Sequence, residues 1–332
     1  MRSTRLVMLV LSVIPAMLFA QTEPERNRAE ETEWVATPPQ NLGSVINSPN
    51  DEPQVAITHS GLSLYFSSDR PGGYGNLDIW VSHRKSLDAA WGEPQNLGSV
   101  INSKLTEFAP SFSRDDHWMF FPAATSLHPG GVGGIDIYMS YRLDPTDDLG
   151  WQTPINLGPA VNSQFNEFDP IYFEDPRTGE ATLYFISNQE RVPNGHGGFL
   201  FDIYQSTRNA DGSFQPAVKN KELSSPYDDR RVTIRKDGLM LIFTSDRPGS
   251  IGGLDLWVST RSNTHDPWSE PVNLGPTINT EADERGAALA EDGVTLYFSS
   301  NRPGGFGGDD IWVTKLIGRD PQPQREQRRQ IP

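Results

Sequence analysis

The sequence predicts an all-β fold, a five-bladed β-propeller with four antiparallel strands in each blade. One segment recurs five times, roughly every 60 residues. Each copy divides into four short strand-like runs separated by turn residues, which is the pattern of a propeller blade. The fifth copy stops after its third run, while residues 34–43 form a fourth run that precedes the first copy. We therefore expect the 34–43 strand to complete the last blade and close the ring.

The four runs of a blade follow one another in a constant order. The first is DERGAALA at 283–290, and the turn Asp292-Gly293 after it suits a tight hairpin. The second, LYFSS, alternates and is rich in aromatic residues. A Gly-rich loop leads to the third, DIWVT. In the other copies the fourth ends on an NLG phrase, which is degenerate in the third copy (AVKNKELSS from 217). No stretch keeps an apolar period of 3.6 residues, so helix is expected to be nearly absent.

Residues that recur once per blade are expected to build the scaffold. Most of the tryptophans occupy two repeat positions, which favours packing between blades over stacking on sugars. The RPGGYG loop joins two strands and has no Gly-Lys-Ser/Thr ending, so its glycines are expected to allow positive φ in a turn rather than to bind phosphate.

The best-preserved copies are residues 64–82, 241–259 and 296–314. Residues 296–312 (LYFSSNRPGGFGGDDIW) nearly reproduce the run typical of the WD40-like propeller repeat, and the chain from about 41 to 316 resembles the TolB-type periplasmic family. The resemblance implies a propeller fold and a scaffold role in the cell envelope.

Composition and chain ends set further limits. The net charge of −15 argues against nucleic-acid binding, and the lack of cysteine excludes disulfides and thiol catalysis. Residues 1–20 have the layout of a secretory signal peptide, which predicts a periplasmic or secreted protein without a transmembrane anchor after cleavage. We expect a linker at 21–33, the propeller at 34–317 and a disordered tail at 318–332, and the sequence leaves the oligomeric state open.

Five acidic residues open the first strands and are the leading site candidates. If these strands are innermost, the carboxylates ring one mouth of the central channel. A two-residue hairpin turn would place Asp283 opposite Arg302, and likewise Asp51 opposite Arg70 and Asp228 opposite Arg247. The candidate acids are Glu52, Glu107, Glu167, Asp229 and Glu284.

Two interpretations of the acids remain open. In the first, ion pairs and hydrogen bonds pin each Gly-rich loop to its strand. In the second, the incompletely neutralised ring binds a hard cation such as Ca²⁺, the one cofactor that the sequence suggests.

Departures from the repeat are expected to carry function, because loops on a rigid scaffold commonly bind ligands. Blades 2 and 3 have long loops after their second strands, and blade 4 has an unusual first strand at 227–235. These segments are predicted to form one asymmetric patch, and His128 and His196 lie in its neighbouring long loops. The patch residues proposed for ligand binding are Glu190, Arg191, Tyr227, Arg230 and Arg231.

Two functions fit these patterns. The favoured prediction is an exported, non-catalytic propeller that binds an envelope protein or a glycan through its loop face. The alternative is a carbohydrate-active enzyme that uses inner-strand carboxylates at the central channel, as five-bladed glycosidase propellers do. No nucleophile elbow, zincin or phosphate-loop motif occurs, so no catalytic residue is assigned.

Overall fold

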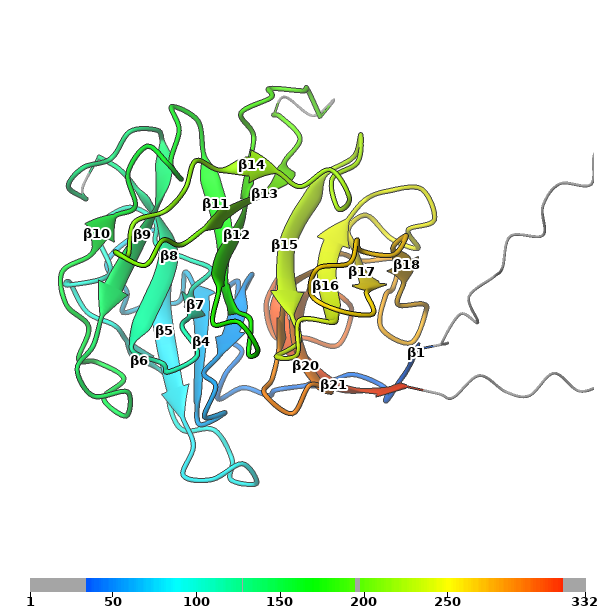
Figure 1. Cartoon of the computed structure of the whole chain (residues 1–332). Helices are drawn as coiled ribbons and strands as arrows, with labels where there is room; N and C mark the ends of the chain where they lie inside the picture. Colours follow the sequence, from blue (N-terminus) through cyan, green and yellow to red (C-terminus); the bar gives the residue numbers. More distant parts are fainter. Residues whose placement is uncertain (1–33, 127, 195–197, 319–332) are drawn as a thin grey trace, which may run out of the picture. The chain divides into compact units, whose positions relative to one another are not determined.

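The computed structural model describes residues 34–126, 128–194 and 198–318. They form five antiparallel sheets in a ring, and these ranges contain no helix (Figure 1). It follows that no helix within these ranges is long and apolar enough to cross a membrane. The predicted all-β, five-bladed propeller is confirmed. The predicted signal peptide, linker and tail, apart from Gly318, lie outside the described residues.

The strands are short and follow chain order within each blade. Blade 1 contains β3 (Val55–Ile57), β4 (Ser63–Ser68), β5 (Asp78–His83) and β6 (Gln95–Asn96). Blade 2 contains β7 (Ser111–Phe112), β8 (Trp118–Ala124), β9 (Ile135–Tyr141) and β10 (Ile155–Asn156). Blade 3 contains β11 (Glu167–Glu174), β12 (Ala181–Ser187), β13 (Asp202–Thr207) and β14 (Val218–Lys219). Blade 4 contains β15 (Asp229–Ile234), β16 (Met240–Ser245), β17 (Asp255–Thr260) and β18 (Val272–Asn273). Blade 5 contains β19 (Glu284–Leu289), β20 (Thr295–Ser300) and β21 (Asp310–Gly318), joined by β1 (Trp34–Ala36) and β2 (Gln40–Asn41).

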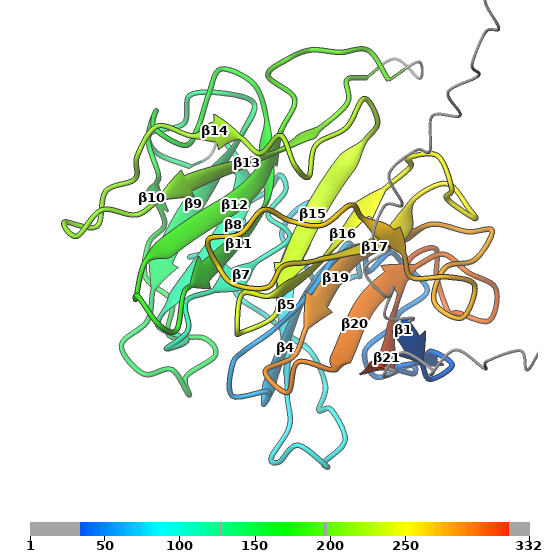
Figure 2. The same ribbon diagram turned by 45° about the vertical axis from the view of Figure 1, so that its right-hand side comes forward.

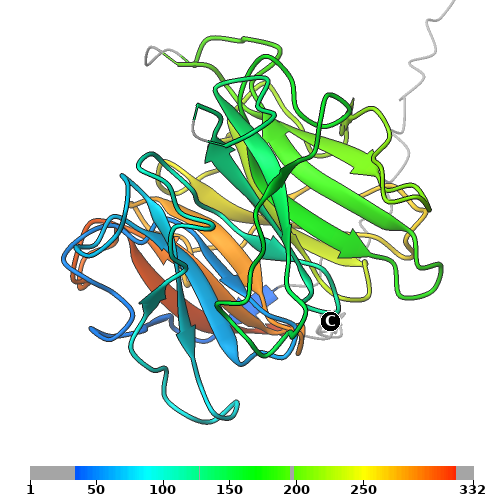
Figure 3. The same cartoon turned by 90° about the vertical axis from the view of Figure 1, so that its left-hand side faces the viewer.

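The N-terminal segment closes the ring, as the sequence predicted. β2 pairs with β21 through Gln40 and Val313, and β1 pairs with the end of β21 through Trp34 and Gly318. Figure 2 shows β1 beside β21, and Figure 3 shows the blue and red ends of the propeller side by side. The closing segment is two strands rather than one, because Pro38 and Pro39 between them lack the N–H that a ladder requires.

A separate hydrophobic cluster fills each interface between neighbouring blades, including the one between blades 5 and 1. At the first interface the ring of Tyr65 lies 4.7 Å from that of Phe112 in blade 2. The recurring Trp257 and Trp312 are buried in such clusters. This agrees with the predicted packing role of the repeated tryptophans.

The Gly-rich loops need glycine for two different reasons. Gly72 has a φ of 97°, the left-handed conformation expected from the sequence. At Gly307, however, an added Cβ would lie 1.9 Å from the carbonyl oxygen of Asn50 in the next blade. Close docking onto the neighbouring blade therefore fixes this second glycine.

The first strands line the central channel. Around the axis, β3, β19, β15, β11 and β7 follow one another in contact. In blades 3, 4 and 5 the first strand carries a β-bulge a few residues after its start. The bulge changes which side chains point into the channel, and the candidate site depends on it.

Candidate functional site

The five candidate acids are buried inside their own blades. Glu52 is fully buried and accepts hydrogen bonds from the Oγ of Ser48 at 2.7 Å and the Oγ of Ser68 at 2.7 Å. The Ser48 backbone N–H donates to its second oxygen at 3.0 Å. The other four acids make the equivalent serine or threonine contacts. All five acids thus hold the loop before their blade, and all but Glu107 also accept a hydrogen bond from a serine of the second strand.

The arginines of the Gly-rich loops pair with these acids. Arg70 contacts Glu52 at 2.9 Å, and Arg302 contacts Glu284 at 2.9 Å. The sequence had paired Arg302 with Asp283, one residue away. Leu289 does pair with Leu296 as predicted, but the bulge shifts the register so that Glu284 lies opposite Ser300. The same correction holds for Asp51 and Asp228, because Arg70 and Arg247 contact Glu52 and Asp229.

Blades 2 and 3 depart from this arrangement. In blade 2 the imidazole Nε2 of His128 takes the arginine's place, 2.8 Å from Glu107. In blade 3 no cation within the described residues pairs with Glu167, which accepts hydrogen bonds from Ser163 and Ser187. Burial raises the pKa of Glu167.

The acids do not converge on a shared cation position. Ca²⁺ requires 6–8 oxygen ligands around one point. Among the residues described here, no three histidine or acidic side chains are grouped closely enough to hold a metal ion. The geometry thus favours the loop-pinning interpretation over the carboxylate ring.

The unpaired Glu167 gives a prediction. Glu167→Gln is expected to leave the free energy of unfolding unchanged or raise it by up to about 1 kcal/mol at pH 7, since it removes an unpaired buried charge. Glu52→Gln is expected to lower it by about 1–3 kcal/mol, because Arg70 loses its charged partner. Because the folded-state pKa of Glu167 is raised, its contribution to stability is lost as pH rises through that pKa. Any advantage of Glu167→Gln should therefore vanish near pH 4, which urea unfolding at both pH values would check.

The predicted asymmetric patch is only partly assembled. Arg191 has a φ of 53° and its guanidinium lies 4.7 Å from the ring of Phe199. Glu190 forms an ion pair with Lys219 at 2.8 Å. Tyr227 is exposed, and the half-buried Arg230 pairs with the neighbouring Asp228. His196 lies outside the described residues.

Arg231 was placed on this patch, but it lies in the centre of the channel. The bulge after Arg230 turns the Arg231 side chain inward, where it is 1% exposed. Its guanidinium donates to the carbonyl oxygens of Val55 at 2.8 Å, Pro110 at 3.3 Å and Ala287 at 3.3 Å. These three carbonyls belong to blades 1, 2 and 5.

Blade 3 supplies the counter-charge for Arg231. The carboxylate of Asp169 lies 3.8 Å from the Nη1 of Arg231. Asp169 occupies the equivalent bulge position in β11, is buried and has a φ of 51°. Burial raises the pKa of Asp169 and lowers the pKa of Arg231. One side chain from blade 4 thus joins the first strands of all five blades.

A cavity of about 100 Å³ occupies the channel beside Arg231, toward the turns that connect the first and second strands. Residues from all five first strands or their flanks line it. Its apolar wall includes Phe112, Ile171, Phe173 and Leu289.

One further ionisable side chain from each of the five blades lines this cavity: His59, Arg114, Glu174, Lys236 and Glu291. Burial and, next, the carboxylate of Asp115 raise the pKa of Glu174. The ammonium of Lys236 lies 3.5 Å from the carboxylate of Glu291. The cavity therefore combines a carboxyl group that favours its protonated form with a charge-paired carboxylate.

Neither glutamate was among the sequence candidates. Glu174 directly precedes the extended first hairpin of blade 3, residues 175–182. Glu291 immediately precedes the turn Asp292-Gly293. The acids next to the first hairpin turns were the available signal, whereas the five predicted acids lie at the opposite ends of the first strands.

No family model matches the chain, and no curated protein matches it. Solved structures with the same fold include an α-L-arabinofuranosidase from Lactobacillus brevis (TM-score 0.55, 14% identity, covering 84% of this chain and 94% of that one). Another is an α-L-arabinofuranosidase from Podospora anserina in complex with cellotriose (0.51, 12%, 87% and 98%). A third is a β-xylosidase/α-arabinofuranosidase from a compost microbial metagenome in complex with xylotriose (0.53, 14%, 88% and 100%). At these identities the likeness establishes the fold.

These comparisons correct the favoured functional prediction. The non-catalytic scaffold rested on the equivalence of the recurring residues across the blades, and no family model supports the resemblance to the TolB-type family. The named structures that share the fold are instead glycoside hydrolases. The alternative, a carbohydrate-active propeller, is taken up as the proposed function below.

Proposed function

We propose that this chain is a carbohydrate-active propeller that hydrolyses a glycosidic bond at the channel cavity. The observation that carries the proposal is the pair of glutamates, Glu174 and Glu291, on a cavity lined by all five blades. Glycoside hydrolysis requires one carboxyl group that donates a proton and one carboxylate that activates water or attacks the sugar.

The two glutamates suit different roles. Glu174, whose pKa is raised, acts as the general acid that protonates the leaving-group oxygen. Glu291 acts as the carboxylate, and Lys236 balances its charge. The volume of about 100 Å³ is small beside the ~300–1,000 Å³ of larger ligand pockets. The enzyme therefore removes a single terminal sugar residue rather than cutting inside a chain.

In this proposal the resemblance to the TolB-type repeat concerns the scaffold. The repeat residues that produce this resemblance, such as Arg302 and Asp310, form ion pairs or hydrogen bonds within their own blade and its loops. Export through the predicted signal of residues 1–20 would bring the enzyme to polysaccharides outside the cytoplasm.

The proposal is tested by hydrolysis of methyl glycosides of L-arabinofuranose and D-xylose with the whole protein, because their alkoxide leaving group requires the proton that Glu174 donates. Glu174→Gln and Glu291→Gln are each expected to lower kcat by about 10²–10⁴-fold, the usual contribution of acid–base catalysis. The rate should fall as pH rises through the raised pKa of Glu174, because the acid must be protonated. Glu174→Gln should remove that part of the pH profile.

Glu93→Gln is the matched control, because Glu93 is exposed and does not line the channel cavity. It should retain the wild-type kcat. Absence of turnover by the wild type on these glycosides, or wild-type turnover by Glu174→Gln, would contradict the proposal.

A further inference from the structure

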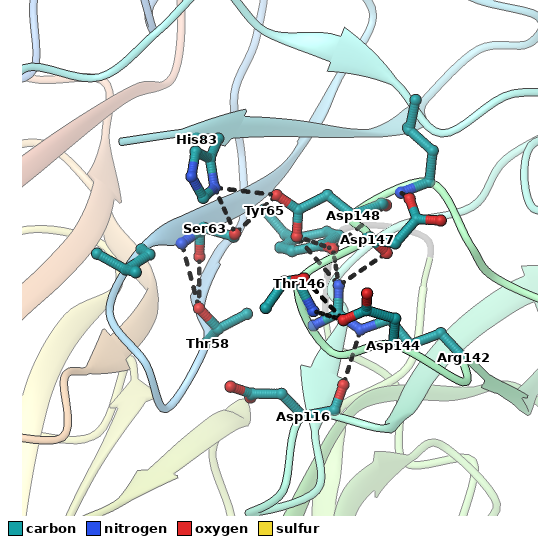
Figure 4. A network of polar contacts seen from close by, with 12 residues as sticks. Thr58, Ser63, Tyr65, His83, Asp116, Arg142, Asp144, Thr146, Asp147 and Asp148 are labelled. Atoms are coloured by element: carbon teal, nitrogen blue, oxygen red, sulfur yellow. Dashed lines mark hydrogen bonds and ion pairs between the residues drawn. The ribbon is translucent and has the colours of Figure 1, made fainter. Parts of the chain in front are cut away.

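The interface between blades 1 and 2 contains a buried carboxylate cradle. Asp148, from the loop after β9, accepts hydrogen bonds from Ser63 Oγ at 2.7 Å, Tyr65 OH at 3.0 Å and Arg142 Nη1 at 3.0 Å (Figure 4). Arg142 is fully buried, and its guanidinium lies 4.5 Å from the ring of Trp151. Blade 1 thus provides two hydroxyl donors, and blade 2 provides the arginine together with the acid that they bind.

The same donors recur between blades 3 and 4. In the strand registers, Ser68 pairs with Asp78 in blade 1, and Ser187 pairs with Asp202 in blade 3. Counting back from these pairs, Thr182 and Tyr184 take the positions of Ser63 and Tyr65. In blade 4, Arg261 directly follows β17, as Arg142 directly follows β9. Its guanidinium lies 4.0 Å from the ring of Trp268, the counterpart of Trp151.

The loop acid is missing from this second cradle, and the nearby carboxylate of Glu222, from the loop after β14, accepts a hydrogen bond from the backbone N–H of Trp268 at 2.9 Å. The loop from Arg261 to Trp268 is two residues shorter than the loop from Arg142 to Trp151. Its only acid, Asp266, accepts a hydrogen bond from Asn263 in the same loop. Over the described ranges, Arg261 has no ion pair and donates its Nε–H to the carbonyl of Gly238 at 2.7 Å.

A cavity of about 440 Å³ lies at this position, and Tyr184 and Arg261 both line it. Tyr184 is 5% exposed, and its hydroxyl has no hydrogen-bond partner among the residues that the structure describes. Burial raises the pKa of Tyr184, so the hydroxyl remains a donor at neutral pH. An unpaired donor and an arginine without an ion pair therefore face a cavity large enough for one sugar residue.

We propose that this cavity binds a uronic acid residue of a polysaccharide, with its carboxylate held by Tyr184 and Arg261 as Asp148 is held by Tyr65 and Arg142. Hydroxyl and amide side chains suited to a sugar complete the lining, among them Thr178, Thr182, Gln205, Thr207 and Asn220. The other ionisable lining residues are Asp175, Glu180, Glu222, Lys219, Lys221 and His265. That the ligand is a sugar rests on the proposed function. That it carries a carboxylate rests only on the geometry of Tyr184 and Arg261.

The test is isothermal titration of the whole protein with D-glucuronate, D-galacturonate, acetate and D-glucose at equal ionic strength. At least one uronate should bind, glucose should not bind, and acetate should bind at least about tenfold more weakly. Tyr184→Phe and Arg261→Lys should each weaken uronate binding by about 10–150-fold, the usual effect of losing a hydrogen bond to a charged group.

Tyr65→Phe is the matched control, because Asp148 already fills that cradle, and it should leave the uronate Kd unchanged. Equal binding of glucose and uronate, or wild-type affinity in both cavity variants with unchanged melting temperatures, would overturn the proposal. Acetate as tight as uronate would show a carboxylate site without sugar recognition and would also overturn it. Because Glu174→Gln should bind uronate like the wild type, a failure of the proposed hydrolysis is separable from a failure of this site.

Discussion

Arg231→Met is expected to lower the free energy of unfolding by about 3–5 kcal/mol, the usual cost of breaking a buried ion pair from one side. The variant leaves the buried Asp169 carboxylate without its closest cation. It also removes the donor that three buried backbone carbonyls share. At roughly 2–4 °C per kcal/mol for a large domain, the melting temperature should fall by about 10 °C.

A double variant separates the two costs. Asp169→Asn removes the charge and suits the φ of 51° at this bulge, since asparagine tolerates the left-handed region. Arg231→Met combined with Asp169→Asn should regain part of the lost stability, because no unpaired charge remains buried. The carbonyls still lack their donor, so recovery should be incomplete.

Arg230→Met is the matched control for the first prediction. Arg230 precedes Arg231 in the chain but is partly exposed, and its ion pair is with Asp228. Because the Arg230 side chain is 33% exposed, its replacement should cost about 1 kcal/mol, less than that of the fully buried Arg231. Equal melting temperatures for Arg231→Met and Arg230→Met would show that the channel arginine does not hold the blades together.

Repetition made the fold predictable from the sequence. A residue such as Trp312, which has counterparts in other blades, reveals a shared structural position without any knowledge of its contacts. The sequence has no fourth run after Lys315 but has an extra run near Gln40. Comparison with the other copies therefore predicted that this extra run closes the ring, and the pairing of Gln40 with Val313 confirms it. Ion pairs between the loop arginines and acids at the start of the first strands were predictable, because residues equivalent to Glu284 and Arg302 recur together in other blades.

The bulge explains why the pairing partners and Arg231 were misplaced. A single extra residue in β15 or β19 shifts the register by one and sends the next side chain to the other face. The residue types around Arg231 do not mark a bulge. Arg230 and Arg231 are adjacent and chemically identical, yet the first is partly exposed and the second is buried. Residues on the channel side of the first strands could therefore not be assigned from alternation alone.

The candidate sites were hidden for a different reason. Glu174 and Glu291 come from different blades, and only the curvature of the closed ring places both on one cavity. The cavity between blades 3 and 4 depends on the loop after Arg261, which is two residues shorter than the loop after Arg142. This difference in length can be interpreted only once Tyr184 and Tyr65 are known to occupy equivalent positions. Both sites thus require contacts between distant segments of the chain.

Asp148→Ala is expected to lower the free energy of unfolding by about 3 kcal/mol, because Arg142 is fully buried and loses its charged partner. Tyr65 and Ser63 lose their acceptor in the same variant. Asp147→Ala is the control, because only the backbone carbonyl of Asp147 contacts Arg142. A melting temperature for Asp148→Ala no lower than that of Asp147→Ala would contradict the structural role of the carboxylate.

The same variant tests whether these donors recognise a free carboxylate. Asp148→Ala leaves the cradle of Tyr65 and Arg142 without its acid, as the shorter loop does for Tyr184 and Arg261. Acetate should raise the melting temperature of Asp148→Ala by more than that of the wild type, because a ligand that binds only the folded state stabilises it. Chloride at equal ionic strength should not, and adding Tyr65→Phe should weaken the acetate effect. If acetate and chloride act alike, the cradle requires the tethered side chain, and the carboxylate selectivity proposed for its counterpart between blades 3 and 4 loses its precedent within this molecule.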